Sequence, residues 1–390
     1  MSEIAFARSA PPYLSEASVP RAGAGLKPDV TGFYEEATGS VQYVVADPIT
    51  RRCAIIDPVL DFDPTSGATR TTSADRLLRH IEARGLTLEW ILDTHPHADH
   101  FSAAGYLKDM TGAPTAIGDR VTEVQKIWKM AYHLPETFPT DGSQWDHLFA
   151  DGERFAVGAI EARALLSPGH TLCSMTYVIG DAAFVHDTVF MPDSGTARAD
   201  FPGGDALEIW RSIQRILKLP DDTRLFTGHD YRPGGREARW ESTVAEQKAH
   251  NFHLKDHDES SFVKFRNERD RSLPLPNLML SALQVNIAGG RLPPQEEDRR
   301  RYLKIPLNAV PLVSSVRSSS AEAALTDDVG YQNTAAVRYD SIDLVNDSFG
   351  RQADECTEGL GPTVNRRRTS ATGASYPWCL RPLSRRFRPS

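Results

Sequence analysis

The sequence predicts a mixed α/β protein built as a four-layer sandwich with a small C-terminal helical cap. Three features of the 390-residue chain support this fold class. Strand-like and helix-like segments alternate between residues 41 and 132, short strands follow from 155 to 185, and the segments after 236 have helical periodicity without a strand signal. Alternation followed by a run of strands is typical of sheets that pack face to face under helices.

The first elements are two strands and a helix. Strands are expected over 41–46 and 53–57, and the second strand ends at Pro58 because proline cannot donate to a strand ladder. A helix is expected over 72–84, with Ser73 as a candidate N-cap and Gly85 as its stop.

The later elements follow the same two periodicities. A further strand is expected at 88–93, and helices at 101–110, 120–132, 206–217, 236–253 and 260–271. The helix at 206–217 is the clearest of these because Ile209, Ile213 and Ile216 share one face. The last two helices form the expected cap over the sheet edge.

The segment from Thr94 to His100 places three imidazoles and a carboxylate directly after a strand. Side chains i and i+2 of a strand share a face, so His95 and His97 can reach one ion together. Asp99 and His100 follow where the chain turns into the next helix, and can serve a second ion. The spacing therefore predicts a metal site at the end of this strand.

Three further candidate ligands each follow a later strand. His170, Asp187 and His229 come directly after the strand-like segments 160–166, 182–185 and 224–226. A rigid sheet presents a site built on loops in this way. Seven candidate ligands exceed the four that a closed structural zinc site uses. A catalytic metal site is therefore favoured over a structural clip or a chance cluster of surface histidines.

In this order, the pattern H-x-H-x-D-H followed by His, Asp and His resembles the metallo-β-lactamase superfamily, whose fold is an αββα sandwich with the metals at one edge. Over residues 29–310 the chain is more closely similar to the persulfide (sulfur) dioxygenases, or ETHE1-like proteins, and to their bacterial β-lactamase-hydrolase-like subgroup. The stretch 187–204 carries this finer resemblance, because Arg198, Asp200 and Phe201 match the R-x-D-F of that family. Supporting matches lie at 57–60, 229–231 and 303–308.

The resemblance implies a mononuclear non-haem Fe(II) enzyme that oxidises glutathione persulfide with O2 to sulfite and glutathione. It assigns one Fe(II) per chain to His95, His170 and Asp187. Two imidazoles and one carboxylate leave open positions for substrate and O2. The remaining candidates, which orient these ligands in the dioxygenases, are His97, Asp99, His100 and His229.

Two other function classes stay open. In hydrolytic relatives the same four residues complete a two-metal site, so a hydrolase with two Zn(II), such as hydroxyacylglutathione hydrolase (glyoxalase II) or a lactonase, is the alternative. A non-catalytic binding or regulatory protein is the third class. The complete ligand set argues against it, because crowded imidazoles and carboxylates cost stability when no ion fills the site.

Two residues are candidates for contact with the substrate. Arg198 can grip a glutathione carboxylate with two hydrogen bonds or form a structural salt bridge to Asp200. Tyr231 can hydrogen-bond the substrate or simply pack. His186 stands where the common pattern has glycine, and we expect its side chain to point away from that of Asp187, because neighbouring strand residues face opposite sides.

Composition limits the other classes of partner. A net charge of -8 argues against nucleic acid, and no window holds the roughly 18 apolar residues of a membrane helix. Four cysteines without C-x-x-C spacing indicate neither a disulfide framework nor a thiolate zinc site. We expect a soluble protein of a reducing compartment, the cytoplasm, or the mitochondrial matrix if the source is eukaryotic. The sequence leaves homodimer formation open.

Three regions are expected along the chain. Residues 1–28 form a loose leader, 29–310 form the catalytic domain with its helical cap from about 236, and 311–390 form a disordered tail rich in Arg and Ser. A basic docking tail is the functional alternative for the last region, and a gene-prediction artefact is the other.

Overall fold

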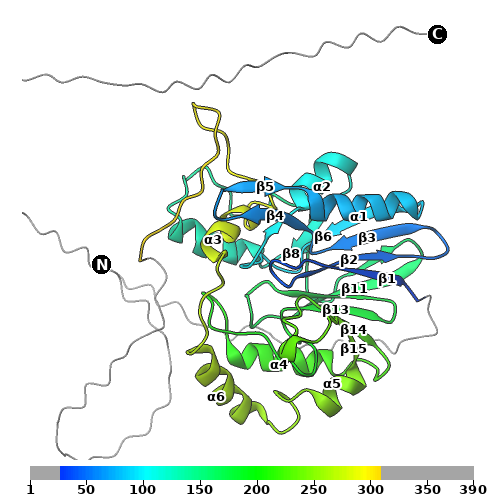
Figure 1. Ribbon diagram of the computed structural model, residues 1–390. Coiled ribbons are helices and arrows are strands. Elements are labelled where there is room, and N and C mark those ends of the chain that lie inside the picture. Colours follow the sequence, from blue (N-terminus) through cyan, green and yellow to red (C-terminus); the bar gives the residue numbers. More distant parts are fainter. Residues whose placement is uncertain (1–26, 309–390) are drawn as a thin grey trace, which may run out of the picture. The chain divides into compact units, whose positions relative to one another are not determined.

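In the computed structural model, which describes residues 27–308, two sheets pack face to face and helices cover both outer faces (Figure 1). This is the αββα order that the sequence predicts. The expected leader over 1–28, apart from its last two residues, and the expected tail over 311–390 lie outside the described residues.

The first sheet carries the strand that leads into the metal motif. Its strand order is β1 (Asp29–Tyr34), β2 (Val41–Ala46), β3 (Arg52–Ile56), β6 (Thr87–Leu92), β8 (Thr115–Gly118) and β9 (His147–Phe149). On its outer face lie α1 (Thr72–Ala83), α2 (Ala104–Thr111) and α7 (Met279–Asn286), and α3 (Val121–Ala131) packs beside them. Leu77 of α1 and Leu107 of α2 are fully buried against Ile55 and Ile91 of the sheet.

The second sheet carries the strands that lead into the other ligand loops. Its order is β10 (Arg154–Val157), β11 (Ile160–Leu166), β12 (Met175–Ile179), β13 (Ala182–His186), β14 (Arg224–Thr227) and β15 (Glu241–Thr243). Its outer face is covered by α4 (Ala206–Ile216), α5 (Val244–His250) and α6 (Glu259–Asp270). Ile209, Ile213 and Ile216 are buried together, as their helical spacing predicts.

The core between the sheets is aromatic and aliphatic. Tyr43 and Ile56 of the first sheet meet Tyr177, Phe184 and Phe226 of the second. Helices bury the outer faces as well, so β2 and β13 are buried along their whole length. Strands that are buried on both faces have nearly continuous apolar sequences rather than strict alternation.

Several short elements differ from the sequence prediction. β1 was not expected, nor were the strands of a small third sheet, β5 (Ala68–Arg70), β4 (Val59–Asp63) and β7 (Phe101–Ser102). The helix expected at 101–110 therefore begins only at Ala104. Ser73 is not an N-cap, because it lies inside α1 and its backbone N and Oγ donate to Asp61 at 3.0 and 2.5 Å.

The segment 236–253 is not the single helix that was expected. It holds a short strand, β15, which pairs with β14, and then α5; a single 3-10 turn, η1 (Pro233–Gly235), precedes it. The Thr243 side chain accepts a hydrogen bond from Glu246 N and caps α5, which places the break between strand and helix at this residue. The C-terminal helices also divide between layers, since α7 packs on the first sheet and α6 on the second.

The topology brings the ligand loops to one edge. β11 and β13 both pair antiparallel with β12, and β14 pairs parallel with β13, so β11, β13 and β14 all end at the same side of the second sheet. The start of β2 joins this edge, because Ser40 bridges to His229 and Val41 N donates to Gly228 O at 2.8 Å. No helix among residues 27–308 is long and apolar enough to cross a membrane.

Candidate metal centre

The loops after β6, β11 and β13 bring His95, His170 and Asp187 together. Their candidate ligand atoms lie within 4.8 Å of one another, and all three side chains are buried. His95 Nε2 and Asp187 Oδ1 have no hydrogen-bond partner among the described residues. Buried polar atoms are almost always paired, so this convergence of unpaired lone pairs fits a bound cation.

Neighbouring groups fix how the His95 ring presents its nitrogens. Thr94 Oγ1 donates to Asp57 Oδ2 at 2.8 Å and lies 2.9 Å from His95 Nδ1. The hydroxyl has only one hydrogen, so it must accept from His95 Nδ1–H. His95 Nε2 then carries the lone pair that faces the cluster.

The same arrangement holds for His170. Its Nδ1 lies 2.9 Å from the carbonyl oxygen of Arg198, which can only accept, so Nδ1 carries the proton. Its Nε2 is left facing Asp187 Oδ2 at 3.6 Å. Hydrogen bonds of this kind hold the ring orientation and tautomer of metal-binding histidines.

The other four candidates surround this group and contact one another. Asp99 Oδ2 accepts from Ser40 Oγ and from His100 Nδ1, both at 3.0 Å. His229 Nε2 lies 3.3 Å from Asp99 Oδ2 and 3.4 Å from Asp187 Oδ1. His97, Asp99 and His100 also satisfy the distances of a metal-binding group. The structure therefore gathers all seven predicted residues, and buried atoms without a partner among residues 27–308 occur in both sets: His95 Nε2 and Asp187 Oδ1 in the first, and both nitrogens of His97 with His100 Nε2 in the second.

Burial sets the protonation of the imidazoles. Burial, together with the neighbouring imidazoles, lowers the pKa of His95 well below its usual value, and burial also lowers the pKa of His170. Both rings are then neutral near pH 7, which is the form that binds a metal. Burial alone would lower the pKa of His97, but the Asp57 carboxylate, 3.0 Å from its Nε2, outweighs burial and raises that pKa to about 9.

His186 is buried beside the cluster but belongs to none of the metal-binding groups. Its φ of 38° and the register shift between Phe184 and His186 break the strand geometry, so the alternation argument does not apply there. Burial lowers its pKa to about 3, and its Nε2 lies 3.0 Å from Thr188 Oγ1.

Arg198 and Tyr231 both line the cavity next to the metal ligands. Arg198 makes the salt bridge that was one of its two predicted roles, with Nε and Nη2 donating to Asp200 at 2.6 and 2.8 Å, and Nη1 donating to Pro274 O at 2.5 Å. Tyr231 stacks on His229, with ring centroids 5.5 Å apart and planes 3° from parallel.

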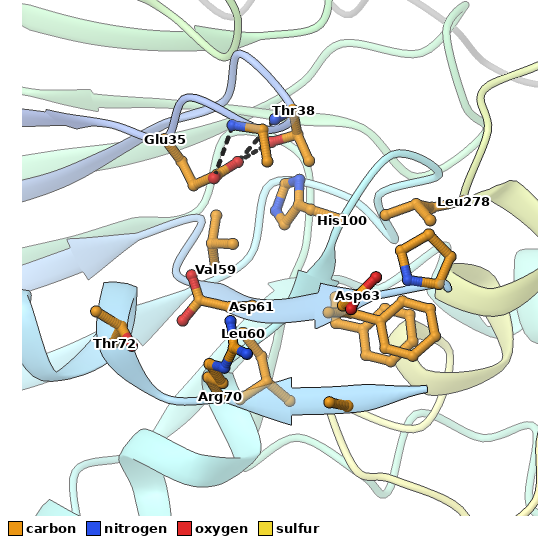
Figure 2. A pocket seen from close by; sticks show the side chains of 15 residues that line it. Glu35, Thr38, Val59, Leu60, Asp61, Asp63, Arg70, Thr72, His100 and Leu278 are labelled. Carbon is orange, nitrogen blue, oxygen red and sulfur yellow. Dashed lines mark hydrogen bonds between the residues drawn. The ribbon is translucent and has the colours of Figure 1, made fainter. Parts of the chain in front are cut away.

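The cavity has a volume of about 630 Å³ and opens over the cluster. Asp99, His170 and Asp187 line one part of it, and Phe190, Phe201, Leu273 and Leu275 give it apolar walls. A second cavity of about 470 Å³ shares Thr38, Phe62 and Leu278 with it. Figure 2 shows His100, Glu35, Asp61 and Arg70 around this second cavity.

A buried ion pair on α6, which we call the α6 clamp, holds the loop that orients His170. The clamp consists of Arg266 and Asp270, each nearly inaccessible, with Arg266 Nε 2.9 Å from Asp270 Oδ1. Arg266 Nη1 donates to Thr196 O at 3.0 Å, and Asp270 Oδ2 accepts from Ala199 N at 2.8 Å. Arg198, whose carbonyl meets His170, lies between these two anchors. An i, i+4 pair of opposite charges on a predicted helix is the one sign of the α6 clamp in the sequence.

Gly228 also has a supporting role that could not be recognised in the sequence. A Cβ atom added there would lie 2.7 Å from Asp187 Oδ1 and 3.2 Å from the His186 backbone.

We expect Gly228→Ala to displace the Asp187 carboxylate and to lower metal affinity at least about 10-fold, as measured by equilibrium dialysis. Gly234→Ala is the control, because its added methyl group meets nothing within 4 Å although its φ is +69°. It should reduce stability without changing metal affinity, and equal metal affinities in both variants would contradict the steric argument.

Comparison with known proteins identifies the family of the region that holds these residues. The profile of the Metallo-beta-lactamase superfamily matches residues 37–229. The chain is 68% identical over 283 residues to the Beta-lactamase hydrolase-like protein of Xylella fastidiosa, which covers 73% of this chain and 65% of that protein. This chain thus spans slightly less than two thirds of that relative. It is 48% identical over 277 residues to Glyoxylase B2 of Dictyostelium discoideum, covering 70% of this chain and 94% of that protein.

Two further matches carry the name ETHE1. The chain is 29% identical over 275 residues to the human mitochondrial Persulfide dioxygenase ETHE1, covering 69% of this chain and 92% of that protein. The crystal structure of ETHE1 from Myxococcus xanthus superposes with a TM-score of 0.54 at 27% identity, covering 67% of this chain and all of that one. The fold, the gathered histidines and aspartates, and relatives matched over nearly their whole length lead to one conclusion: this chain belongs to the metallo-β-lactamase superfamily.

Proposed function

We propose that this chain is a mononuclear non-haem Fe(II) persulfide dioxygenase, in which glutathione persulfide, O2 and water give glutathione, sulfite and two protons. The observation that carries the proposal is the set of His95, His170 and Asp187, whose candidate ligand atoms lie within 4.8 Å of one another beside a cavity, with His95 Nε2 and Asp187 Oδ1 lacking hydrogen-bond partners in the described part of the chain. Two imidazoles and one carboxylate are the ligand set that Fe(II) oxygenases use. When bound, Fe(II) would supply the open positions and the redox chemistry by which O2 oxidises a sulfur atom.

The residues around the ligands have positioning roles in this proposal. Thr94 and the Arg198 carbonyl hold the protons of His95 and His170 on Nδ1, so that each Nε2 stays available. Phe190 and Phe201 form apolar walls that exclude water from the reacting sulfur. Tyr231 lines the same cavity, and we propose that it contacts the substrate.

A hydrolase with two Zn(II) is the second candidate, and two observations favour it. His97, Asp99 and His100 also gather at ligand distances, and the relative with 48% identity is named Glyoxylase B2. Against it, Asp99 and His100 bond to each other and to Ser40, and His97 lies 3.0 Å from the Asp57 carboxylate, so each residue of this set also has a contact within the protein.

Metal analysis of protein purified without oxygen tests the proposal, together with O2 uptake on glutathione persulfide and hydrolysis of S-lactoylglutathione. One iron per chain with O2 uptake is the expected result. Two zinc ions per chain with thioester hydrolysis and no O2 uptake would contradict the dioxygenase proposal and support the hydrolase.

Replacing Asp99 separates the two candidates further. In a mononuclear site Asp99 only supports the ligands, so we expect Asp99→Ala to keep some iron and to lose about 10- to 100-fold in activity or metal affinity. The measurement is metal content and O2 uptake on the same preparation. Complete metal loss, equal to that of Asp187→Ala, would show that Asp99 is itself a required ligand.

A further inference from the structure

Three guanidinium groups line the cavity that opens over the metal ligands, those of Arg198, Arg266 and Arg269. A guanidinium is a planar donor that recognises carboxylate with two parallel hydrogen bonds. The group that can bind a substrate anion is the one that still has free N–H donors, so the partners of each arginine decide the question.

Arg198 and Arg266 already use most of their five N–H donors within the protein. Arg198 donates to both oxygens of Asp200 and to Pro274 O. Arg266 donates to Asp270 through Nε and Nη2, at 2.9 and 2.5 Å, and to Thr196 O through Nη1. Arg266 is also only 1% exposed, so a ligand could not reach it without breaking the α6 clamp.

Arg269 differs from both. It lies in the last turn of α6, three residues after Arg266, and it is exposed. Among residues 27–308 its side chain makes no hydrogen bond, ion pair or ring contact, yet it lines the same cavity as His170 and Asp187. Arg266, one turn earlier on the same helix, is held by its bonds to Asp270 and to Thr196 O.

We propose that Arg269 binds the anionic end of the substrate, a free carboxylate of the thiol carrier, while the sulfur lies at the metal ligands. This inference rests on the proposed function and assigns to Arg269 the carboxylate contact that the sequence suggested for Arg198. The carrier is therefore a thiol with a carboxylate several bonds from its sulfur, such as the glycine end of glutathione. Arg198 acts as a positioning residue, because its side chain holds Asp200 and its carbonyl holds His170.

The test uses S-methylglutathione, which contains the carrier but cannot react, and measures its binding to the metal-loaded full-length chain by titration calorimetry. Arg269→Gln should weaken binding by roughly 5- to 30-fold, which lies between the effect of an exposed ion pair and that of a charge-assisted hydrogen bond, because the site is open to solvent. Arg271→Gln is the matched control, since Arg271 is exposed at the same end of α6 but does not line the cavity. It should bind as the unmodified protein does.

A second ligand, the glycine ethyl ester of S-methylglutathione, identifies the partner of Arg269. The ester lacks the negative charge of the glycine carboxylate. The unmodified protein should therefore bind the ester more weakly than S-methylglutathione, by the same factor as the loss that Arg269→Gln causes. The Arg269→Gln variant should bind the ester and S-methylglutathione equally well. Undiminished binding by Arg269→Gln, an ester penalty that persists in that variant, or no binding of S-methylglutathione by the unmodified protein would each overturn the inference. O2 uptake on glutathione persulfide decides the proposed function separately, because the binding measurement needs no turnover.

Discussion

Replacing His95, His170 or Asp187 by alanine is expected to abolish both metal binding and turnover. Each change leaves only two of the three side chains that we propose as ligands of the ion. The measurements are metal content per chain after purification without oxygen, and O2 uptake with glutathione persulfide. Circular dichroism on the same samples separates metal loss from unfolding.

The same experiment can also show that one of the three residues is not a ligand. A variant that keeps one metal per chain and near-normal activity would show that the replaced side chain does not bind the ion. Loss of metal from all three variants, with partial retention in Asp99→Ala, is the pattern that a single three-residue site requires.

Breaking the α6 clamp should have the second largest effect. Asp270→Asn leaves the buried Arg266 guanidinium without its counter-charge, which costs about 3–5 kcal/mol in pairs of this kind. It also weakens the anchor on Ala199 N, next to the carbonyl that orients His170. We therefore expect a lower melting temperature together with weaker metal binding.

A double variant separates these two consequences. Arg266→Met with Asp270→Leu removes both charges and keeps the volume filled, a change that is often neutral for stability. The variant still lacks the hydrogen bonds to Thr196 O and Ala199 N. Metal affinity should then fall about 10- to 100-fold at a nearly unchanged melting temperature. Native metal affinity in this folded variant would show that the loop keeps its position without the clamp.

The residues that gather in the candidate site could be located from the sequence because each follows a strand, and a strand end is visible in local periodicity. H-x-H-x-D-H and the isolated His170, Asp187 and His229 needed no knowledge of tertiary contacts. The layer order followed from the same patterns, since Ile209, Ile213 and Ile216 mark the outer helix α4 without ambiguity.

The supporting residues could not be predicted because their roles depend on contacts between distant segments. Arg266 contacts Thr196 across 70 positions of sequence, and the steric limit at Gly228 comes from Asp187, directly after the neighbouring strand β13. Strands of two to five residues, such as β4, β5 and β7, are too short for a period to be recognised. Their pairing in a small third sheet is decided by tertiary packing rather than by local preference.

The origin of the ligands in both sheets has a consequence for the cohesion of the molecule. His95 follows β6 of the first sheet, whereas His170 and Asp187 follow strands of the second. An ion bound by these three residues would therefore cross-link, reversibly, the two halves of the sandwich, which otherwise pack through the apolar residues between them. His95 and Asp187 are 92 positions apart, 187 minus 95, so this link closes a long loop of chain and restricts the unfolded state accordingly. Removing the ion with a chelator should therefore weaken the packing between the two sheets as well as abolish activity. Faster amide hydrogen exchange in β2 and β13 would show this weakening.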